Sequence, residues 1–434
     1  MKEFKKGQKI GVKSGGQLEV IQKLGEGGQG IVYKVSYNNK EYALKWYFGN
    51  KLHDADRFYK NIENNIRKGA PTDAFLWPLE ITEYLDGSFG YLMKLRPGNY
   101  EDFSKFLLAK VRFSGISAVI NAALCITAGF RALHNNGFSY QDLNDGNFFV
   151  DPKTGDVLIC DNDNVAPYGE ALGIAGKCRY MAPEVVMGKK KPDVHTDRFS
   201  LAVVLYLLFF ANHPLEGTRT IKNPCLTEEL ERKLYGTDPV FVYDPVNHAN
   251  APVEGIHNNE MKFWPLFPEF LRKTFQDAFS HEKMVGQDIQ DRVMEREWLK
   301  VFTNLRDCLT VCPSCKEETF LDLEQPESSC ICCGHKISRP PVLKVKRYVV
   351  ALTSGKNIYA CHTVHDSDDY KEVKGEIIPS PSNPDVFGLK NLSGKTWVVS
   401  LPNGNTTDVA DGKTIKIGKG FKINFGNNNV GAIL

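Results

Sequence analysis

The octapeptide YQDLNDGN, residues 140–147, combines side chains that could take part in phosphoryl transfer. Asp142 offers a carboxylate that could accept a proton, and Asn147 offers an amide oxygen, a ligand that suits the hard cation Mg²⁺. A short apolar run, FFV, follows directly and predicts a strand. Asp, Asn and Gly also favour turns, so a polar loop without any chemistry is the alternative. The rest of the chain has to decide between these two interpretations.

A glycine-rich segment and a lysine near the N-terminus are compatible with the same chemistry. Residues 18–24 predict a strand, and the glycines that follow have a GxGxxG spacing at Gly25, Gly27 and Gly30. The next residues are β-branched and aromatic, so a second strand follows, whereas a dinucleotide-binding motif would open a helix. Lys45 closes a third predicted strand. A hairpin with a glycine loop lets backbone amides approach phosphates, and a buried lysine could hold them.

A lysine that holds phosphates needs an acidic partner to orient it. Residues 54–69 predict a helix, with Gly69 as its stop signal. Glu63 is the only internal acid past the first turn of this helix, eighteen residues after Lys45. We therefore expect Glu63 to form an ion pair with Lys45, and the alternative is a solvated helix charge.

Further motifs follow in order along the chain. The segment DVLICDND predicts a strand that ends at Asp161, fourteen residues after Asn147, and GKCRYMAPE ends at Glu184. An acid then opens the buried helix TDRFSLAVVLYLLFF, and QDRVMEREWL contains Arg292. Over about residues 15–305 the chain resembles the eukaryotic-type Ser/Thr protein kinases of bacteria.

The resemblance implies a role for each motif residue. Asp142 corresponds to the acid that accepts the proton of the substrate hydroxyl, and Asn147 and Asp161 correspond to the Mg²⁺ ligands. Glu184 corresponds to an acid that pairs with a buried arginine, here Arg292. The expected lining of the adenine pocket is Leu24, Val32, Ala43, Met93, Phe149 and Cys160. The implied activity is transfer of the ATP γ-phosphate to Ser or Thr of protein substrates.

Several residues depart from the family pattern. Gln141 stands where the family has the arginine that binds a phosphorylated activation loop, and Tyr168 is the only hydroxyl between residues 162 and 179. We therefore expect that phosphorylation of this loop does not control activity. Asn144 stands where the family has a lysine on the γ-phosphate, and Lys177 stands where it has Thr or Ser. We expect the Lys177 ammonium to replace the missing lysine, and the alternative is a solvated loop lysine.

Two alternatives to a protein kinase stay open. The family's Asp-Phe-Gly motif reads Asp161-Asn162-Asp163, which removes the apolar switch residue and adds a carboxylate. Such losses favour a pseudokinase scaffold that binds nucleotide, but five residue types needed for activity are retained, at Lys45, Glu63, Asp142, Asn147 and Asp161. A small-molecule kinase also uses an Asp…Asn loop, although the APE motif, the Asp197 helix and Arg292 argue for a protein kinase.

Five of the eleven cysteines crowd into residues 312–333. They form two CxxC pairs with fourteen residues between them, at Cys312 and Cys315 and at Cys330 and Cys333. Four thiolates in this spacing predict a structural zinc ribbon with no open coordination position. Cys332 and His335 are alternative ligands, but Cys333 completes the second CxxC.

After residue 340, short alternating segments separated by Gly-containing turns predict an all-β sandwich. The order of these segments resembles the second half of a forkhead-associated (FHA) domain. The Gly-Arg pair and the Ser-x-x-His that would hold phosphothreonine are missing, so a plain β interaction module is an equal alternative. The expected fold is therefore α+β, with a kinase domain at 1–305 (N-lobe about 15–97, C-lobe about 98–305), a zinc ribbon at 306–340 and a β domain at 341–434.

Composition limits the remaining classes of function. The 434 residues are 42% hydrophobic and 24% charged with a net charge of +2, as in a soluble globular protein without a nucleic-acid charge signature. The first sixteen residues lack the apolar region of a signal peptide, and the longest apolar run, 201–211, is too short to span a bilayer. We expect a cytoplasmic protein that binds neither nucleic acid nor membrane. Residues 214–265 form a long insert to which the sequence assigns no role.

Overall fold

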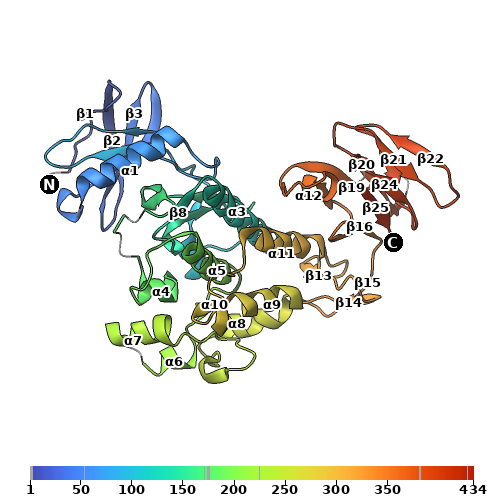
Figure 1. The fold of residues 1–434 in the computed structure, drawn as a ribbon. Coiled ribbons are helices and arrows are strands. Elements are labelled where there is room, and N and C mark those ends of the chain that lie inside the picture. The colour runs from blue at the N-terminus through green and yellow to red at the C-terminus, as the bar shows by residue number, and fades with distance from the viewer. Residues whose placement is uncertain are drawn as a thin grey trace. The chain divides into compact units, whose positions relative to one another are not determined.

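The computed structural model describes residues 3–52, 54–170, 172–173, 176–223, 225–380, 383–427 and 429–434 (Figure 1). The chain divides into two compact units. The first comprises Met1–Ser114, Asn121–Met261 and Phe275–Glu295, and the second comprises Gly115–Ile120, Lys262–Thr274 and Arg296–Leu434.

The first unit begins with a six-stranded antiparallel sheet in the order β1-β2-β3-β4-β6-β5. The strands are β1 (Lys9–Gly11), β2 (Gln17–Glu26), β3 (Gly30–Tyr37), β4 (Lys40–Tyr47), β5 (Glu80–Ile81) and β6 (Gly90–Lys94). Helix α1 (Ala55–Lys68) lies against this sheet, and its Phe58 and Ile62 pack with Tyr47 and Tyr91 in one apolar cluster (Figure 1).

The glycine loop connects β2 and β3, as the sequence predicts. Gly27 N donates to Gly30 O at 2.9 Å and closes the turn. A Cβ on Gly30 would stand 2.1 Å from Trp46 O, so the close approach of β4 requires glycine there, whereas Gly25 and Gly27 have open space beside them.

Short strands and helices complete the first unit. Two small antiparallel sheets pair β8 (Phe138–Tyr140) with β11 (Val165–Pro167), and join β10 (Val157–Ile159), β9 (Phe148–Val150) and β7 (Glu101–Asp102). The helices that follow α1 and reach into this unit are α2 (Phe103–Leu107), α3 (Ile116–Asn135), α4 (Pro183–Val186), α5 (Val194–Phe210), α6 (Thr218–Ile221), α7 (Glu228–Arg232), α8 (Asn258–Phe263), α9 (Glu269–Ala278), α10 (His281–Met284) and α11 (Glu295–Asp307). Asp193 caps α5 by accepting bonds from His195 N and Thr196 N.

Helix α3 is the single helix in the described ranges that is long and apolar enough to cross a membrane. Of its most apolar 18-residue window, 61% is buried inside the protein. Core helices pass the same test of length and composition, so the observation is weak evidence for a membrane span.

The described residues of the insert 214–265 (214–223 and 225–265) include several short helices. Asn250, which is buried, donates to Leu215 O at 2.9 Å and to Val240 O at 2.7 Å. Its Oδ1 accepts bonds from Gly217 N and Arg219 N. One amide therefore ties distant parts of the insert together.

The second unit contains the cysteine-rich segment and the C-terminal strands. Two hairpins, β12 (Leu309–Val311) with β13 (Glu318–Phe320) and β14 (Glu327–Ser329) with β15 (Lys336–Ser338), carry the CxxC pairs. Left-handed residues follow each pair, at Lys316 and Gly334, and allow the tight turns.

The C-terminal strands form two sheets with a shared core. One sheet has the order β17-β16-β25-β24-β21-β22 and the other β18-β19-β20-β23. The elements are β16 (Val342–Val345), β17 (Tyr348–Ala351), β18 (Asn357–Tyr359), α12 (Ala360–Thr363), β19 (Val373–Ser380), β20 (Asn383–Asn391), β21 (Trp397–Ser400), β22 (Thr406–Val409), β23 (Thr414–Lys416), β24 (Lys422–Asn424) and β25 (Val430–Ile433). Buried residues of both sheets, including Leu343, Ile377 and Trp397, form one cluster. The β-rich C-terminal region is confirmed, while the FHA likeness and the three domain boundaries stay predictions.

Candidate active site

The predicted catalytic loop forms a tight turn held by its own amides. Asn144 caps the short helix η2 (Asp145–Asn147), because its side chain accepts a bond from Gly146 N at 3.0 Å. Asn147 Oδ1 accepts a bond from Asn144 N at 2.6 Å. The Asn144 amide also donates to Asp142 Oδ1 at 3.3 Å. The loop thereby fixes the half-buried Asp142 carboxylate at its start.

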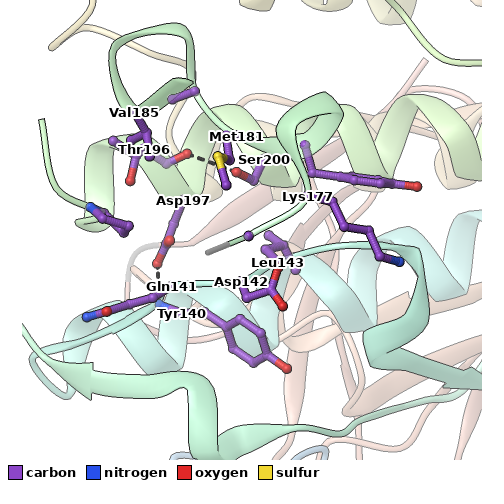
Figure 2. A pocket seen from close by; sticks show the side chains of 14 residues that line it. Tyr140, Gln141, Asp142, Leu143, Lys177, Met181, Val185, Thr196, Asp197 and Ser200 are labelled. Atoms are coloured by element: carbon purple, nitrogen blue, oxygen red, sulfur yellow. Dashed lines mark hydrogen bonds between the residues drawn. The ribbon is translucent and has the colours of Figure 1, made fainter. Parts of the chain in front are cut away.

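A cavity of about 20 Å³, enough for a single water molecule, lies beside Asp142. Figure 2 shows the Asp142 carboxylate and the Lys177 side chain on the same side of this pocket. The opposite wall comes from α5, where the buried Asp197 accepts a bond from Tyr140 N at 2.6 Å. This bond anchors the strand from which the catalytic loop emerges.

His134 supports the same anchor from helix α3. Its ring nitrogens lie 3.1 Å from Asp197 Oδ2 and 2.8 Å from Glu295 Oε1. Burial lowers the pKa of His134, but the two carboxylates outweigh this effect and raise it to about 9. The two carboxylates therefore favour the cationic form of His134, which lies between Asp197 and Glu295.

The environment of Asp142 suits a base. Burial raises the pKa of its carboxyl above the usual value. The Asn144 amide, the backbone N–H of Lys177 and the Lys177 ammonium act in the opposite direction and favour the ionised form. Asp142 therefore binds a proton more readily than an exposed aspartate does. The donors from Asn144 and Lys177 stabilise its ionised form.

Lys177 lies where the sequence places it, against the catalytic loop. Its Nζ donates to Asn144 Oδ1 at 3.0 Å and lies 3.4 Å from Asp145 Oδ1. Because Asn144 itself bonds Asp142, a chain of polar contacts connects the ammonium to the carboxylate. The side chain of Lys177 is 56% exposed, so a ligand can reach it. A direct action on phosphate stays a prediction.

The two predicted Mg²⁺ ligands lie at the same end of the β9–β10 hairpin. Phe148 pairs with Ile159, and Cys160 N donates to Asn147 O at 2.9 Å. Asp161 follows in the left-handed conformation, with φ 52° and a side chain that is 43% exposed. Aspartate tolerates this conformation better than most residues. The hairpin therefore brings an amide and an accessible carboxylate together.

Lys45 has two acidic partners, and neither is Glu63. Its Nζ lies 3.2 Å from Asp161 Oδ1 and 2.8 Å from Asp163 Oδ2. Burial opposes the positive charge, but the two carboxylates raise the pKa of Lys45 above its usual value. The lysine is therefore charged and held beside a predicted Mg²⁺ ligand.

The expected Lys45–Glu63 ion pair is wrong for this structure. Glu63 instead bonds Lys13 at the protein surface. The inner face of α1 presents two amides, Asn61 and Asn65, which donate to Val165 O at 2.8 and 2.9 Å. The packing of Phe58 and Ile62 turns this face inward and leaves Glu63 on another side of the helix.

Asp163 is the site residue that the sequence analysis did not assign. It has no solvent exposure, and besides Lys45 it accepts bonds from the hydroxyls of Tyr47 at 2.7 Å and Tyr91 at 3.1 Å. The extra carboxylate in the Asp161-Asn162-Asp163 motif was the available signal. Its partner could not be inferred, because the pairing depends on strand register.

Gln141 contacts the activation loop directly. Its Nε2 donates to Glu170 O, and its Oε1 accepts from Leu172 N at 2.8 Å. A neutral amide thereby holds the loop by its backbone, where the family's arginine would need a phosphate.

The predicted pair of Glu184 and Arg292 is confirmed. The guanidinium makes two parallel bonds of 2.8 Å to the carboxylate, and Arg292 is buried. Bidentate pairs of this kind are strong and directional.

Most of the predicted adenine-pocket residues lie together. Ala43, Met93 and Cys160 are buried in one apolar cluster, with Val32 and Phe149 packed against it. Leu24, in contrast, is 45% exposed and lies outside that cluster. The structure thus forms an apolar floor next to Lys45, which pairs with Val32 across β3 and β4.

The four predicted zinc ligands converge in the second unit. The Sγ atoms of Cys312, Cys315, Cys330 and Cys333 all lie within 4.8 Å of one another, and this cluster could hold a metal ion. Cys332 is exposed and lies outside the cluster, as the CxxC spacing predicts.

Comparison with known proteins agrees with the geometry. A model of the protein kinase domain matches residues 18–238. Serine/threonine-protein kinase MPS1 of Encephalitozoon cuniculi is 27% identical over 283 residues, 63% of this chain and 44% of that protein. Human cGMP-dependent protein kinase 2 is 26% identical over 219 residues, which are 46% of this chain and 26% of that protein. Mouse protein kinase C delta type is 27% identical over 201 residues, which are 45% of this chain and 29% of that protein.

The chain spans less than half the length of these three relatives. The protein kinase model matches residues 18–238, which precede the cysteine cluster and the β-rich region in the chain. The relatives are eukaryotic, and the bacterial part of the predicted resemblance stays a prediction. The predicted fold class, a kinase domain followed by a β-rich region, is confirmed.

Proposed function

Because this chain belongs to the protein kinase family, we propose that it transfers the γ-phosphate of ATP to Ser or Thr hydroxyls of other proteins. The observation that carries the proposal is the grouping of Asp142 with Lys177, through Asn144, and of Lys45 with Asp161, whose charge acts on Asp142. The apolar cluster contains Ala43 and Cys160, which are close to Lys45 and Asp161 in the sequence. The Ser/Thr specificity follows the names of the relatives.

Each residue has a defined part in the proposed reaction. Asp142 accepts the proton of the substrate hydroxyl as the oxygen attacks phosphorus, and its raised pKa improves it as a base. Lys45 and the glycine loop would hold the phosphates of ATP. Asn147 and Asp161 supply oxygen ligands suited to Mg²⁺, which neutralises charge on the phosphates when bound.

Transfer of labelled phosphate tests the proposal. The full chain is incubated with γ-labelled ATP and Mg²⁺, alone and with a generic protein such as casein. Label in protein supports the proposal. ATP binding without any transfer would replace it with the nucleotide-binding scaffold, and label only in an added metabolite would replace it with a small-molecule kinase.

Activity is expected to be independent of activation-loop phosphorylation. Gln141 holds the loop through backbone bonds, and Tyr168 is the only hydroxyl of residues 162–179. Protein treated to completion with a phosphatase should keep its rate, and Tyr168→Phe should match wild type. Loss of most of the activity after either treatment would contradict this expectation.

Gln141→Ala should lower the rate, because it removes the hydrogen bonds that hold the backbone of the loop at Glu170 and Leu172.

The cysteine cluster is proposed to bind one structural Zn²⁺. Sulfurs bound at about 2.3 Å round one zinc ion lie about 3.8 Å apart in a tetrahedron. The sulfurs of Cys312 and Cys333 are 3.8 Å apart, and those of Cys315 and Cys330 are 3.7 Å apart. The distances therefore suit zinc, and with four protein ligands the ion would have no open position for catalysis.

Metal analysis of purified protein should find about one zinc per chain, the number that four thiolates round one ion require. Replacing Cys312 and Cys315 by Ser should release it and make the segment sensitive to proteolysis. Cys332→Ser is the matched control, because Cys332 is exposed and outside the cluster, and it should keep the metal. Zinc retained in the double variant would place the ligands elsewhere.

A further inference from the structure

Lys45 forms a buried polar cluster with the side chains of Tyr47, Tyr91 and Asp163. Lys45 and Tyr91 face each other in the register of β4 and β6, and Tyr47 lies two residues after Lys45 on the same face of β4. All three side chains converge on Asp163. The two hydroxyls and the ammonium find an acceptor, and the carboxylate finds a cation, as buried polar groups require.

We propose, on the basis of the proposed function, that Asp163 is the positioning residue that holds Lys45 in the nucleotide site. Related kinases carry the acid for this purpose on a helix, and here the polar side chains on the inner face of α1 are the amides Asn61 and Asn65. Asp163 lies two residues after Asp161, so one short segment provides the predicted Mg²⁺ ligand and the partner of the lysine.

The two carboxylates differ in what they can bind. Asp161 is 43% exposed and can leave Lys45 for a metal ion. Asp163 has no exposure, and its carboxylate bonds only Lys45 and the two tyrosines among the described residues. Asp163 is therefore the permanent partner of Lys45, and Asp161 is the exchangeable one. Movement of α1 would not break this ion pair.

Asp163→Asn tests the assignment, because it keeps the size of the side chain and removes its charge. Asp161 would then be the only counter-ion of Lys45, and binding of Mg²⁺ would have to compete with that pair. We expect the affinity for ATP in the presence of Mg²⁺ to fall about tenfold, the effect of losing roughly one hydrogen bond to a charged group. The Mg²⁺ concentration needed for half-maximal ATP binding should rise as well.

Calorimetric titration of the full chain with ATP at several Mg²⁺ concentrations measures both effects, and thermal unfolding verifies that each variant is folded. Glu63→Gln removes the acid that the structure places at the surface, and it should bind ATP like wild type. A folded Asp163→Asn protein with unchanged ATP affinity and Mg²⁺ dependence would overturn the assignment. A larger loss in Glu63→Gln than in Asp163→Asn would also overturn it.

A second variant keeps the test decisive if Asp163→Asn does not fold. Tyr47→Phe with Tyr91→Phe removes the hydroxyls that orient Asp163 and retains the aromatic packing. Its Mg²⁺ dependence should shift in the same direction by a smaller amount, and no shift would overturn the proposal. Because these measurements follow binding, a wild-type protein that binds ATP as expected but transfers no phosphate would overturn only the proposed function.

Discussion

Replacing Asp142 by Asn is expected to lower kcat by about 10²–10⁴-fold, the contribution typical of a positioned general base. Asparagine has the same shape but cannot accept the proton of a substrate hydroxyl. The affinity for ATP should change little, because the hydrogen bonds of Asp142 go to Asn144 and to the backbone of Lys177, whereas Lys45 is held by Asp161 and Asp163.

Steady-state rates and ATP titrations of the same protein preparations measure the two quantities. Asp86→Asn is a matched control, since Asp86 is exposed in a turn with φ 51°, a conformation that asparagine also adopts. The control should retain the full rate. An Asp142→Asn protein with the rate of wild type would remove Asp142 from the reaction and favour another base.

The dependence of the rate on pH is a second measurement of the role of Asp142 as the base. The base acts only when it is ionised, so the rate should be full above the pKa of Asp142 and fall as the pH drops through it. Burial raises this pKa, so the acidic limb should lie above the pH at which an exposed aspartate titrates. This limb should be missing from the residual activity of Asp142→Asn.

The sequence alone predicts the parts of the site that depend on local order. Asn147 and Asp161 come together because a short hairpin brings the ends of its two strands side by side. The cysteines converge because two CxxC turns present sulfurs in a fixed geometry. In both cases the number of residues between the side chains determines that they lie close together in the fold.

The partner of Lys45 is different, because it depends on which face of a helix packs inward. Helical residues advance by about 100° each, so Phe58, Asn61, Ile62 and Asn65 share one face, and Glu63 lies on nearly the opposite one. The apolar residues at 58 and 62 were the available signal for this orientation. The role of Asp163 was beyond such reasoning, because it requires the register that places Tyr91 opposite Lys45.

The second large effect is expected at Lys177, the cation beside the catalytic loop. A γ-phosphate in transfer needs a cation near the base, and Asn144 is neutral where the family has a lysine. The Lys177 ammonium lies 3.0 Å from Asn144 Oδ1. The backbone N–H of Lys177 donates a hydrogen bond to the Asp142 carboxylate. The charge missing from one position is therefore present at a neighbouring one.

Lys177→Met is expected to lower kcat by about 10²-fold, as loss of one charge aimed at the transition state typically does. ATP affinity should change little, because this charge acts mainly in the transition state. The ammonium also favours the ionised form of Asp142, so its removal should raise the pKa of Asp142 and move the acidic limb of the pH profile to higher pH.

Three variants separate a charge effect from a loss of packing. Lys177→Arg keeps the charge and should retain much of the rate, and Lys60→Met changes an exposed lysine of α1 and should have no effect. The double change Asn144→Lys with Lys177→Thr restores the family's arrangement and should recover a good part of kcat. If Lys177→Met kept both its rate and its pH profile, the ammonium would be a solvated surface charge. Asp142 would then work with no cation from either position.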